Sequence, residues 1–309
     1  RGQVYNWIHR YNEEAQGPLR SHRVRRCGRK KILSAEQTVD LLNYKQQQPF
    51  GSSRSARDAL ELPCSYRTVM RSLHQVGLHH RRPAKKIDLT NEHAQRRLAF
   101  AQENLNRDWG LVIFSDEKVF KTSMGTCQPL WRLGNTRYQP QNVSRLRHSG
   151  RITMSMWGWM FSAGPGELVR TSPRMTAAEY VNILQDVLLH SVEAMYSGLH
   201  QFTFVHDNSA VHKARMVSEW FRERPWIEVI HWSPKSPDLN PIENLWAAVV
   251  REWNDVDEGH HVRTRKQLYI HAQTVWERFR GQNTCENLVA SMPRRLEDVI
   301  ANNGFWTKY

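Results

Sequence analysis

The sequence has few cysteines, and none of them lies near another. The four thiols belong to Cys27, Cys64, Cys127 and Cys285, and no C-x-x-C pair occurs. Such wide spacing signals neither a disulfide framework nor a cysteine zinc site. We therefore expect the thiols to be reduced, as in an intracellular protein.

Long apolar runs are absent as well. No apolar stretch reaches the roughly eighteen residues of a membrane span, and no secretory signal pattern opens the sequence. We expect a protein without a membrane partner. The first residue is Arg1 rather than Met, and Val4, Trp7, Ile8 and Tyr11 follow helical spacing. The sequence is thus expected to begin inside a helix, with an N-terminal piece missing.

Acidic residues are scarce in the first third of the sequence. The 309 residues include 44 Lys and Arg against 30 Asp and Glu, a net charge of +14. Basic residues outnumber acidic ones by 21 to 10 in residues 1–108, but only by 23 to 20 in residues 109–309. This asymmetry predicts an N-terminal part that binds a polyanion, joined to a nearly neutral body. The hydrophobic share of 39% and the 12 Trp are typical of a folded protein.

Three short helices are predicted over residues 33–80. Ser34 and Gln37 are spaced as a capping box at the start of the first helix, and "SRSARDALEL" forms the second. The third, "SYRTVMRSLHQVG", has Ser65 as its cap and Gly77 at its end. Three helices of this kind indicate an all-α helix-turn-helix domain. A small helical bundle with no nucleic-acid role is the alternative.

Basic residues on and after the third helix favour DNA as the partner. The outer face of that helix carries Ser65, Tyr66, Arg67 and Arg71. The segment that follows it adds Arg81, Arg82, Lys85 and Lys86. This arrangement suits a helix in the major groove with flanking phosphate contacts. Residues 15–32 are predicted to be a basic linker in which Arg29 and Lys30 contact DNA, and residues 81–108 a basic linker and connecting helix.

Strands and helices alternate over residues 109–309. Strands are predicted at "LVIFSDE", "RITMSMWGWMF", "FTFVHDN" and "WIEVIHW". Helices are predicted at "TAAEYVNILQDVLLHSVEAM", at "VHKARMVSEWFRER" and within residues 263–303. This alternation is typical of an α/β domain.

Two aspartates close predicted strands of this domain. Asp116 ends the first strand and Asp207 ends the third. Functional groups gather at the carboxyl ends of strands in α/β sheets, although a polar residue often ends a strand without any such role. Glu117 adjoins Asp116 but points to the opposite face if the strand continues. Of these two, Asp116 is the preferred site residue.

A third acidic residue follows a proline-rich segment. In "SPKSPDLNPIENLW", residues 233–246, Glu243 occupies the first turn of a predicted helix with Asn240 as cap and Pro241 as first residue. On this segment alone, a capping box explains Glu243 as well as a functional role does. Asp238 is the rival carboxylate, and we interpret it as a turn residue that orients the loop.

Together, "VIFSDE", "HDNSAVH" and "WSPKSPDLNPIENLW" closely resemble motifs of the mariner-type (Tc/mariner superfamily) cut-and-paste DNA transposases. The resemblance extends over nearly the whole chain, including the helix-turn-helix pattern and the basic linker. It implies a ribonuclease-H-like catalytic domain in which Asp116, Asp207 and Glu243 are the catalytic, metal-binding triad. It also implies two Mg²⁺ ions in the active site, with Mn²⁺ as a possible substitute.

The activity that the resemblance implies is DNA transposition. Such an enzyme binds terminal inverted repeats in double-stranded DNA, hydrolyses phosphodiester bonds, and joins the freed 3′-hydroxyl ends to target DNA at TA sites. Residues 1–14 would end a first helix-turn-helix unit and, with an inserted loop at residues 128–151, would hold a homodimer. Asn208 and His212 match the second motif and are candidates for supporting the metal ligands or contacting DNA. A nuclear location is expected.

Two other functions remain open from the sequence. One is a domesticated DNA-binding protein that recognises the repeats without cutting them. The loss of any triad carboxylate would favour it, and all three are present. The other is a ribonuclease-H-like nuclease for RNA–DNA hybrids, but paired helix-turn-helix units suit duplex DNA better.

Overall fold

The computed structural model forms two compact units, Arg1–Lys85 and Lys86–Tyr309. The predicted contact residues Arg29 and Lys30 lie outside the described residues, as does nearly all of the predicted loop 128–151. No helix within the described ranges is long and apolar enough to cross a membrane. The residues that the structure describes are 2–13, 31–122, 135–136, 139, 152–195, 201–253 and 264–309.

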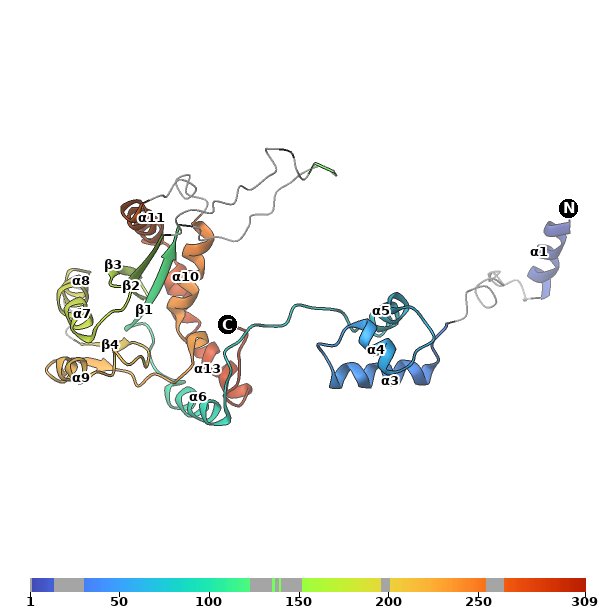
Figure 1. Ribbon diagram of the computed structural model, residues 1–309, viewed down its shortest axis with the longest axis horizontal. Coiled ribbons are helices and arrows are strands. Elements are labelled where there is room, and N and C mark those ends of the chain that lie inside the picture. Colours follow the sequence, from blue (N-terminus) through green and yellow to red (C-terminus); the bar gives the residue numbers. More distant parts are fainter. Residues whose placement is uncertain are drawn as a thin grey trace. The chain divides into compact units, whose positions relative to one another are not determined.

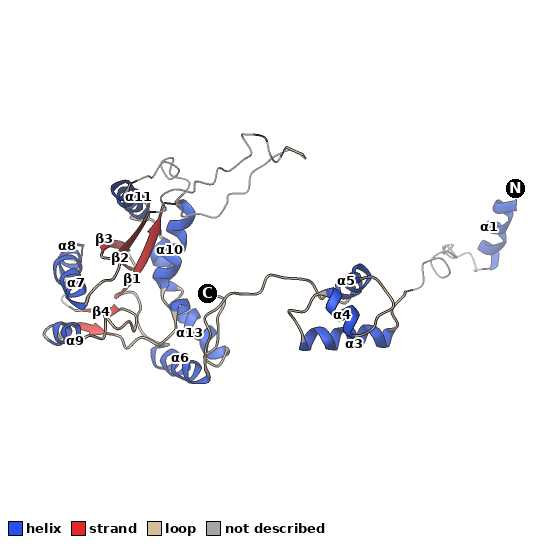
Figure 2. Ribbon diagram, viewed as in Figure 1, coloured by secondary structure: helices blue, strands red, loops and turns tan. Residues whose placement is uncertain are grey.

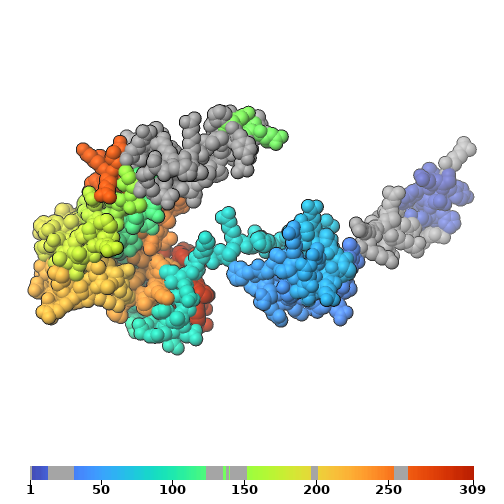
Figure 3. Space-filling model, viewed as in Figure 1, coloured from blue at the N-terminus to red at the C-terminus, as the bar shows by residue number. Residues whose placement is uncertain are grey.

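Helices make up the regular structure described in the first unit (Figure 1). Their bounds are Gly2–Glu13 for α1, Ala35–Gln47 for α3, Ser53–Ala59 for α4 and Tyr66–Gln75 for α5. The helices α3, α4 and α5 enclose a small apolar core of Leu33, Leu41, Ala56, Leu62, Val69 and Leu73. In the space-filling view they form one body, coloured blue (Figure 3).

The sequence correctly predicts how α3 begins and how α5 begins and ends. The Gln37 N–H donates to Ser34 Oγ at 3.0 Å, and the Ser34 N–H donates to Gln37 Oε1 at 3.0 Å, so the predicted capping box is present. Ser65 caps α5 by accepting a hydrogen bond from the Thr68 N–H at 3.3 Å. Gly77 follows α5 with φ of 82°, a left-handed conformation that costs glycine little.

A mixed sheet of five strands, in the order β3-β2-β1-β4-β5, forms the centre of the second unit. The strands are Val112–Lys121 for β1, Thr153–Phe161 for β2, Gly164–Thr171 for β3, Phe202–Val205 for β4 and Ile227–Val229 for β5. β2 is antiparallel to both β1 and β3, whereas β4 is parallel to both β1 and β5. Figure 2 shows these strands in red among the helices. This topology fits the predicted ribonuclease-H-like fold.

Helices cover both faces of the sheet (Figure 1). On one face, α6 and α10 to α13 share a core with Val112, Phe114 and Phe120 of β1. On the other face, α7, η2, α8 and α9 pack against Ile113 and Phe204. The helical bounds are Asn91–Asn104 for α6, Ala177–Asn182 for α7, Ile183–Leu189 for the π-helix η2, His190–Met195 for α8, Arg215–Arg222 for α9, Pro237–Leu239 for the 3-10 helix η3, Pro241–Glu252 for α10, Arg265–Glu277 for α11, Thr284–Ala290 for α12 and Met292–Ala301 for α13.

Two features of the second unit differ from the sequence-based expectation. The sequence does not predict β3, because its opening Gly-Pro-Gly is typical of a turn. β1 does not end at its acidic pair but continues to Lys121, because β2 goes on pairing with it as far as Thr153. Asp116 therefore lies in the middle of a strand and not at its end.

Candidate active site

Asp116 and Asp207 come from neighbouring parallel strands. In the β1–β4 ladder, Phe114 pairs with Val205, and this is the last pair. Asp116 lies two residues beyond this pair on β1, and Asp207 lies two residues beyond it in the segment that follows β4. Phe114 and Val205 both belong to the core on the α10 side of the sheet, and side chains alternate along a strand. Asp116 therefore projects toward the same face as these two residues, next to the point where β4 ends.

Glu243 lies in the first turn of α10, which starts with Asn240 as N-cap as predicted. The Asn240 side chain accepts a hydrogen bond from the Ile242 N–H at 3.4 Å. The Asn240 N–H binds the Pro237 carbonyl at 3.1 Å, so this donor does not form the capping box with Glu243 that the segment alone suggested. The Glu243 carboxylate is left to make other contacts.

Lys118 is the ion-pair partner of Glu243. Its Nζ lies 3.6 Å from Glu243 Oε2, and the two side chains are 30% and 40% exposed. Lys118 follows Asp116 by two positions on β1, so both point to the same face of the sheet. The first turn of α10 and the middle of β1 thus bring two carboxylates and one ammonium group together.

The indole of Trp246 joins α10 to Asp116. Its Nε1–H donates to Asp116 Oδ2 at 3.0 Å, and Trp246 lies three residues after Glu243, on the same side of the helix. Burial raises the pKa of Asp116 to about 7, and the negative charges of Glu243 and Glu117 add to this. A cation bound beside Asp116 would offset both effects by favouring the ionised carboxylate.

Trp246 reaches Asp116 across a glycine. Gly158 of β2 is the pairing partner of Asp116. A Cβ atom on Gly158 would lie 2.9 Å from the ring of Trp246 and 3.3 Å from that of Trp276. The first distance is shorter than real Cβ contacts, so the absence of a side chain at 158 leaves the room in which the Trp246 indole lies.

Asp207 is held by the imidazole of His212. His212 Nδ1 lies 2.8 Å from Asp207 Oδ1 and His212 Nε2 lies 3.2 Å from Glu117 Oε1, while the Ser209 N–H donates to Asp207 Oδ1 at 2.9 Å. The hydrogen bond from His212 is the main cause that lowers the pKa of Asp207. Burial opposes protonation of His212, but its bonds to Asp207 and Glu117 outweigh burial and raise its pKa to about 9. His212 is therefore a cation at neutral pH that donates to two carboxylates.

The two residues predicted to lie beside the triad have different contacts. Asn208 Nδ2 donates to the Trp232 carbonyl at 2.5 Å, which ties the end of β4 to the segment after β5. The ring of His212 packs against Tyr180 and His206, with centroids 4.3 and 4.8 Å apart. Glu117 contacts His212, on the face of the sheet that α7 and α9 cover, whereas Asp116 contacts Trp246 of α10 on the other face. The two neighbouring carboxylates therefore point to opposite faces, as predicted.

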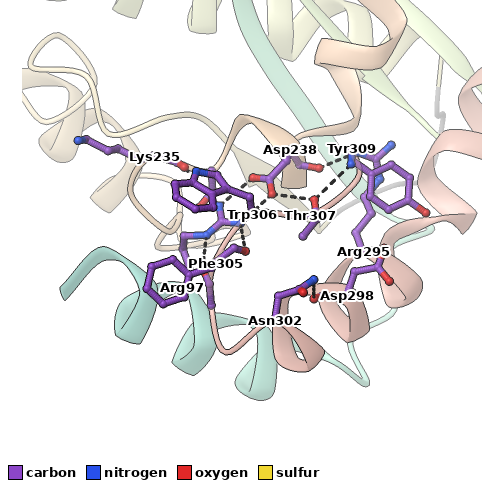
Figure 4. A network of polar contacts seen from close by, with 12 residues as sticks. Arg97, Lys235, Asp238, Arg295, Asp298, Asn302, Phe305, Trp306, Thr307 and Tyr309 are labelled. Atoms are coloured by element: carbon purple, nitrogen blue, oxygen red, sulfur yellow. Dashed lines mark hydrogen bonds and ion pairs between the residues drawn. The ribbon is translucent and has the colours of Figure 1, made fainter. Parts of the chain in front are cut away.

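Asp238 has a buried partner. Its two carboxylate oxygens accept hydrogen bonds from Arg97, each at 2.7 Å, and one oxygen also accepts from Thr307 Oγ1 at 2.8 Å (Figure 4). The side chains of Arg97 and Asp238 are 1% and 11% exposed. Burial alone would raise the pKa of Asp238, but the hydrogen bonds and charge of Arg97 and the bond from Thr307 lower it. The oxygens of Asp238 are thus already engaged.

Across the described parts of the chain, no three carboxylate, imidazole or thiol groups stand ready as a ligand set for a metal ion. Asp207 is hydrogen-bonded to His212, and Glu243 forms an ion pair with Lys118. A divalent cation at this site would have to compete with the Lys118 ammonium for Glu243.

The predicted DNA-binding helix α5 presents its polar side to solvent. Ser65, Arg67 and Arg71 are exposed. The Tyr66 ring lies near two guanidinium groups, with the Arg54 and Arg67 carbons 4.8 and 5.9 Å from its centroid. Arg54 belongs to α4 and was not among the residues predicted to contact DNA.

The basic residues after α5 divide into two groups. Arg81, Arg82 and Lys85 are exposed. Lys86 is exposed as well, but its Nζ donates to the carbonyl of Tyr309 within the second unit. Among these four, only Lys86 has a hydrogen bond that the structure describes, so Arg81, Arg82 and Lys85 are the better candidates for phosphate contacts.

Sequence reasoning missed three residues that shape the site. Lys118 follows Asp116 at the spacing of one strand face, and Trp246 follows Glu243 at the spacing of one helix face, so both signals were present. Arg97 gave no signal, because it lies 141 positions before its partner Asp238.

Comparison with known proteins identifies the family of both units. The family model described as DDE superfamily endonuclease matches residues 111–268, and the model described as Transposase matches residues 40–106. The chain is 33% identical over 255 residues to the Tcb2 transposase of Caenorhabditis briggsae, covering 81% of this chain and 90% of that protein. It is 29% identical over 299 residues to the Tc3 transposase of Caenorhabditis elegans, covering 96% and 88%.

Solved structures support the same fold. The Mos1 transposase paired-end complex with left transposon end has a TM-score of 0.77 at 17% identity, over 99% of this chain and 88% of that one. Mos1 paired-end complexes with Mg and with Mn each have a TM-score of 0.75, at 18% and 17% identity, over the same shares of both chains. The predicted helix-turn-helix region and ribonuclease-H-like domain are thereby confirmed, and the chain belongs to the Tc1/mariner-type DNA transposases, with a DDE endonuclease domain.

Proposed function

We propose that Asp116, Asp207 and Glu243 are the catalytic residues of this transposase and that they hold two Mg²⁺ ions, with Mn²⁺ as a substitute. In this proposal the enzyme binds the terminal inverted repeats of its element, hydrolyses the phosphodiester bonds at the ends, and joins the 3′-hydroxyl groups to target DNA at TA sites. The reaction takes place in the nucleus.

One observation carries the assignment of the active site. Asp116 is close enough to Glu243 for the charge of Glu243 to raise the pKa of Asp116, and a single helix, α10, carries both Glu243 and the indole bonded to Asp116. Asp207 lies two residues after the end of β4, the strand that pairs with β1. Two-metal sites for phosphodiesters take their carboxylates from separate elements, and the three proposed ligands come from β1, from the segment after β4 and from α10.

The chemistry of these donors fits hard divalent cations. Carboxylate oxygens are the ligands that Mg²⁺ and Mn²⁺ prefer, and the site contains no described thiol. Bound ions of this kind make water a stronger nucleophile and stabilise the leaving 3′ oxygen. Two of the solved Mos1 complexes with this fold are described as containing Mg or Mn, which supports the same choice.

The residues of the chain prepare the site for such ions. Trp246 fixes the rotamer of Asp116 through its hydrogen bond, and His212 fixes that of Asp207. Lys118 forms an ion pair with Glu243, and with Glu243 engaged by a cation its ammonium group would be available to a DNA phosphate.

A groove next to Asp207 offers a path for the DNA strand. It has a volume of about 620 Å³, and its charged lining residues are Arg96, Arg107 and Lys213 together with Glu103 and Glu228. Basic side chains along such a groove attract a phosphate backbone. We assign sequence recognition to α5, phosphate contacts to Arg81, Arg82 and Lys85, and the holding of a homodimer to the loop 128–151 and the N-terminal region.

The experiment is a cleavage assay on a plasmid that carries the ends of the element. We expect excision with Mg²⁺ or Mn²⁺ and none after chelation by EDTA. A protein that binds the ends tightly with either metal but never cuts them would instead fit the non-cutting alternative.

A further inference from the structure

The segment before α10 determines where Glu243 points. Ser233–Asn240 is the part of the β5–α10 connection that leads into α10, and it contains Lys235 at φ of 50°, a left-handed conformation that is uncommon for a residue with a side chain. Leu239 is fully buried, and Asn240 caps the helix. Glu243 is the third residue of α10, so a shift of this loop moves its carboxylate.

The buried side chain of Arg97, on α6, holds this loop in place. Its guanidinium donates to the Lys235 carbonyl at 3.2 Å and to Ser236 Oγ at 2.8 Å, in addition to its two bonds with Asp238. It also donates to the Gly304 carbonyl at 2.8 Å. One buried side chain therefore joins the loop to α6 and to the segment that follows α13 (Figure 4).

The segment Gly304–Tyr309 adds further contacts around Asp238. Thr307 is 5% exposed and donates to Asp238 Oδ2 at 2.8 Å. Arg295 of α13 donates to the Asp238 carbonyl at 2.8 Å and lies against the Tyr309 ring, 4.4 Å from its centroid. Asp238 thus receives hydrogen bonds at its side chain and its backbone from two arginines and a threonine.

Such an arrangement suits positioning better than stability alone. A buried ion pair is a weak way to stabilise a fold compared with apolar packing, but it enforces one geometry because its partners must stay in register. Charge-assisted, two-point bonds between arginine and carboxylate are directional. Asp238, the last loop residue that Arg97 contacts, lies five residues before Glu243.

We propose that Arg97, Asp238 and Thr307 are positioning residues for Glu243, so that the segment Gly304–Tyr309 sets how well the active site binds its metal ions. The inference rests on the proposed role of Glu243 as a metal ligand. Positioning groups behind metal ligands commonly change metal affinity or activity by about 10- to 100-fold.

The test compares Thr307→Val with Thr307→Ser in the full chain. Valine keeps the shape and removes the hydroxyl that donates to Asp238 and accepts from the Tyr309 N–H, whereas serine keeps this hydroxyl. Thr171→Val is the matched control, because Thr171 is equally buried, at 5%, on β3. Each variant is measured for DNA affinity, for cleavage of end-bearing DNA across a Mg²⁺ titration, and for the rise in melting temperature that the same Mg²⁺ concentrations cause.

We expect Thr307→Val to need about 10-fold more Mg²⁺ for half-maximal cleavage, with DNA affinity unchanged and recovery at high Mg²⁺. Thr307→Ser and Thr171→Val should both have the Mg²⁺ requirement of the unmodified protein. An unchanged Mg²⁺ requirement in Thr307→Val, or an equal shift in Thr171→Val, overturns the inference.

If Thr307→Val melts too early to assay, Arg97→Lys takes its place. Lysine keeps the charge but loses the two-point bond to Asp238, and this variant must raise the Mg²⁺ requirement. Glu243→Gln separates the two proposals, because cleavage by that variant refutes the active-site assignment itself.

Discussion

The Trp246 indole donates a hydrogen bond to Asp116 Oδ2 at 3.0 Å, which links the helix that carries Glu243 to the central strand of the sheet. Trp276 offers a contrast. It packs against Trp246 with ring centroids 4.7 Å apart, but its Nε1–H donates to the Gly166 carbonyl. The two indoles pack together at a tilt of 32° but have different hydrogen-bond partners, and only that of Trp246 belongs to the proposed site.

Replacing Trp246 by Phe should reduce cleavage beyond its effect on folding. The variant loses the hydrogen bond that orients Asp116, and we expect cleavage at limiting Mg²⁺ to fall by about 10- to 100-fold. Trp276→Phe removes a similar volume and a similar donor without touching Asp116. Cleavage rates and melting temperatures of both variants are the measurement, and equal activity losses at equal stability would contradict the role of Trp246.

Replacing Asp207 by Asn should abolish metal-dependent cleavage. Asparagine keeps the size of the side chain but is a poor ligand for a hard cation. Binding of end-bearing DNA and the circular dichroism spectrum should stay as in the unmodified protein. Full nicking by a correctly folded Asp207→Asn protein would remove this residue from the active site.

Glu243 and Asp238 should respond in opposite ways to the loss of their charge. Glu243→Gln should lose cleavage with stability changed by less than about 0.5 kcal/mol, because its side chain is 40% exposed. Asp238→Asn leaves Arg97 as a buried charge without its ionic partner and should cost about 3–5 kcal/mol of unfolding free energy. Urea unfolding combined with the cleavage assay tests both, and the reverse pattern would make Asp238 the ligand.

The stabilising effect of Asp238 should depend on pH. Its pKa is lowered below the ordinary value of 3.8 in the folded protein. The ionised carboxylate therefore stabilises the fold fully at pH well above 3.8, and this contribution is lost as the pH falls through the lower folded-state pKa. The difference in unfolding free energy between the unmodified protein and Asp238→Asn should be constant from pH 6 to 8 and shrink below about pH 4. A difference that grows on acidification would exclude this ion pair as its source.

DNA contacts at α5 and after it should differ in kind. Arg67→Ala should weaken preference for the terminal repeat over scrambled duplex, since a base contact contributes about 1–3 kcal/mol of discrimination. Arg81→Ala combined with Arg82→Ala should weaken binding to both duplexes and reduce the salt slope by about 2. Titrations of the full chain at several salt concentrations distinguish the two, and identical behaviour of the variants would refute the division.

Much of the fold can be predicted because its signals are local. Cap residues mark the starts of α3 and α5, and the alternation of strands and helices indicates the α/β domain. Contacts between distant segments leave no such mark. The extension of β1 to Lys121 depends on β2, and β3 begins with residues typical of a turn.

The same distinction applies to the site. Asp116, Asp207 and Glu243 stand out in short motifs, and the cap at Asn240 follows from Pro241 and its neighbours. The ion pair of Arg97 with Asp238 does not, because two charged residues so far apart in sequence match many other possible pairs. Glu117 is similar, since only the position of His212 after β4 reveals its bond.

Gly158 carries a consequence for the history of such an element. Copies of a transposable element gather random substitutions, and any codon change that gives position 158 a side chain forces the Trp246 indole away from the sheet, because even a Cβ atom would lie 2.9 Å from it. Those copies should encode proteins that still bind their own ends through α5 while cutting poorly. A single nucleotide change at this codon would thus turn an active copy into one that competes with its relatives for the same DNA.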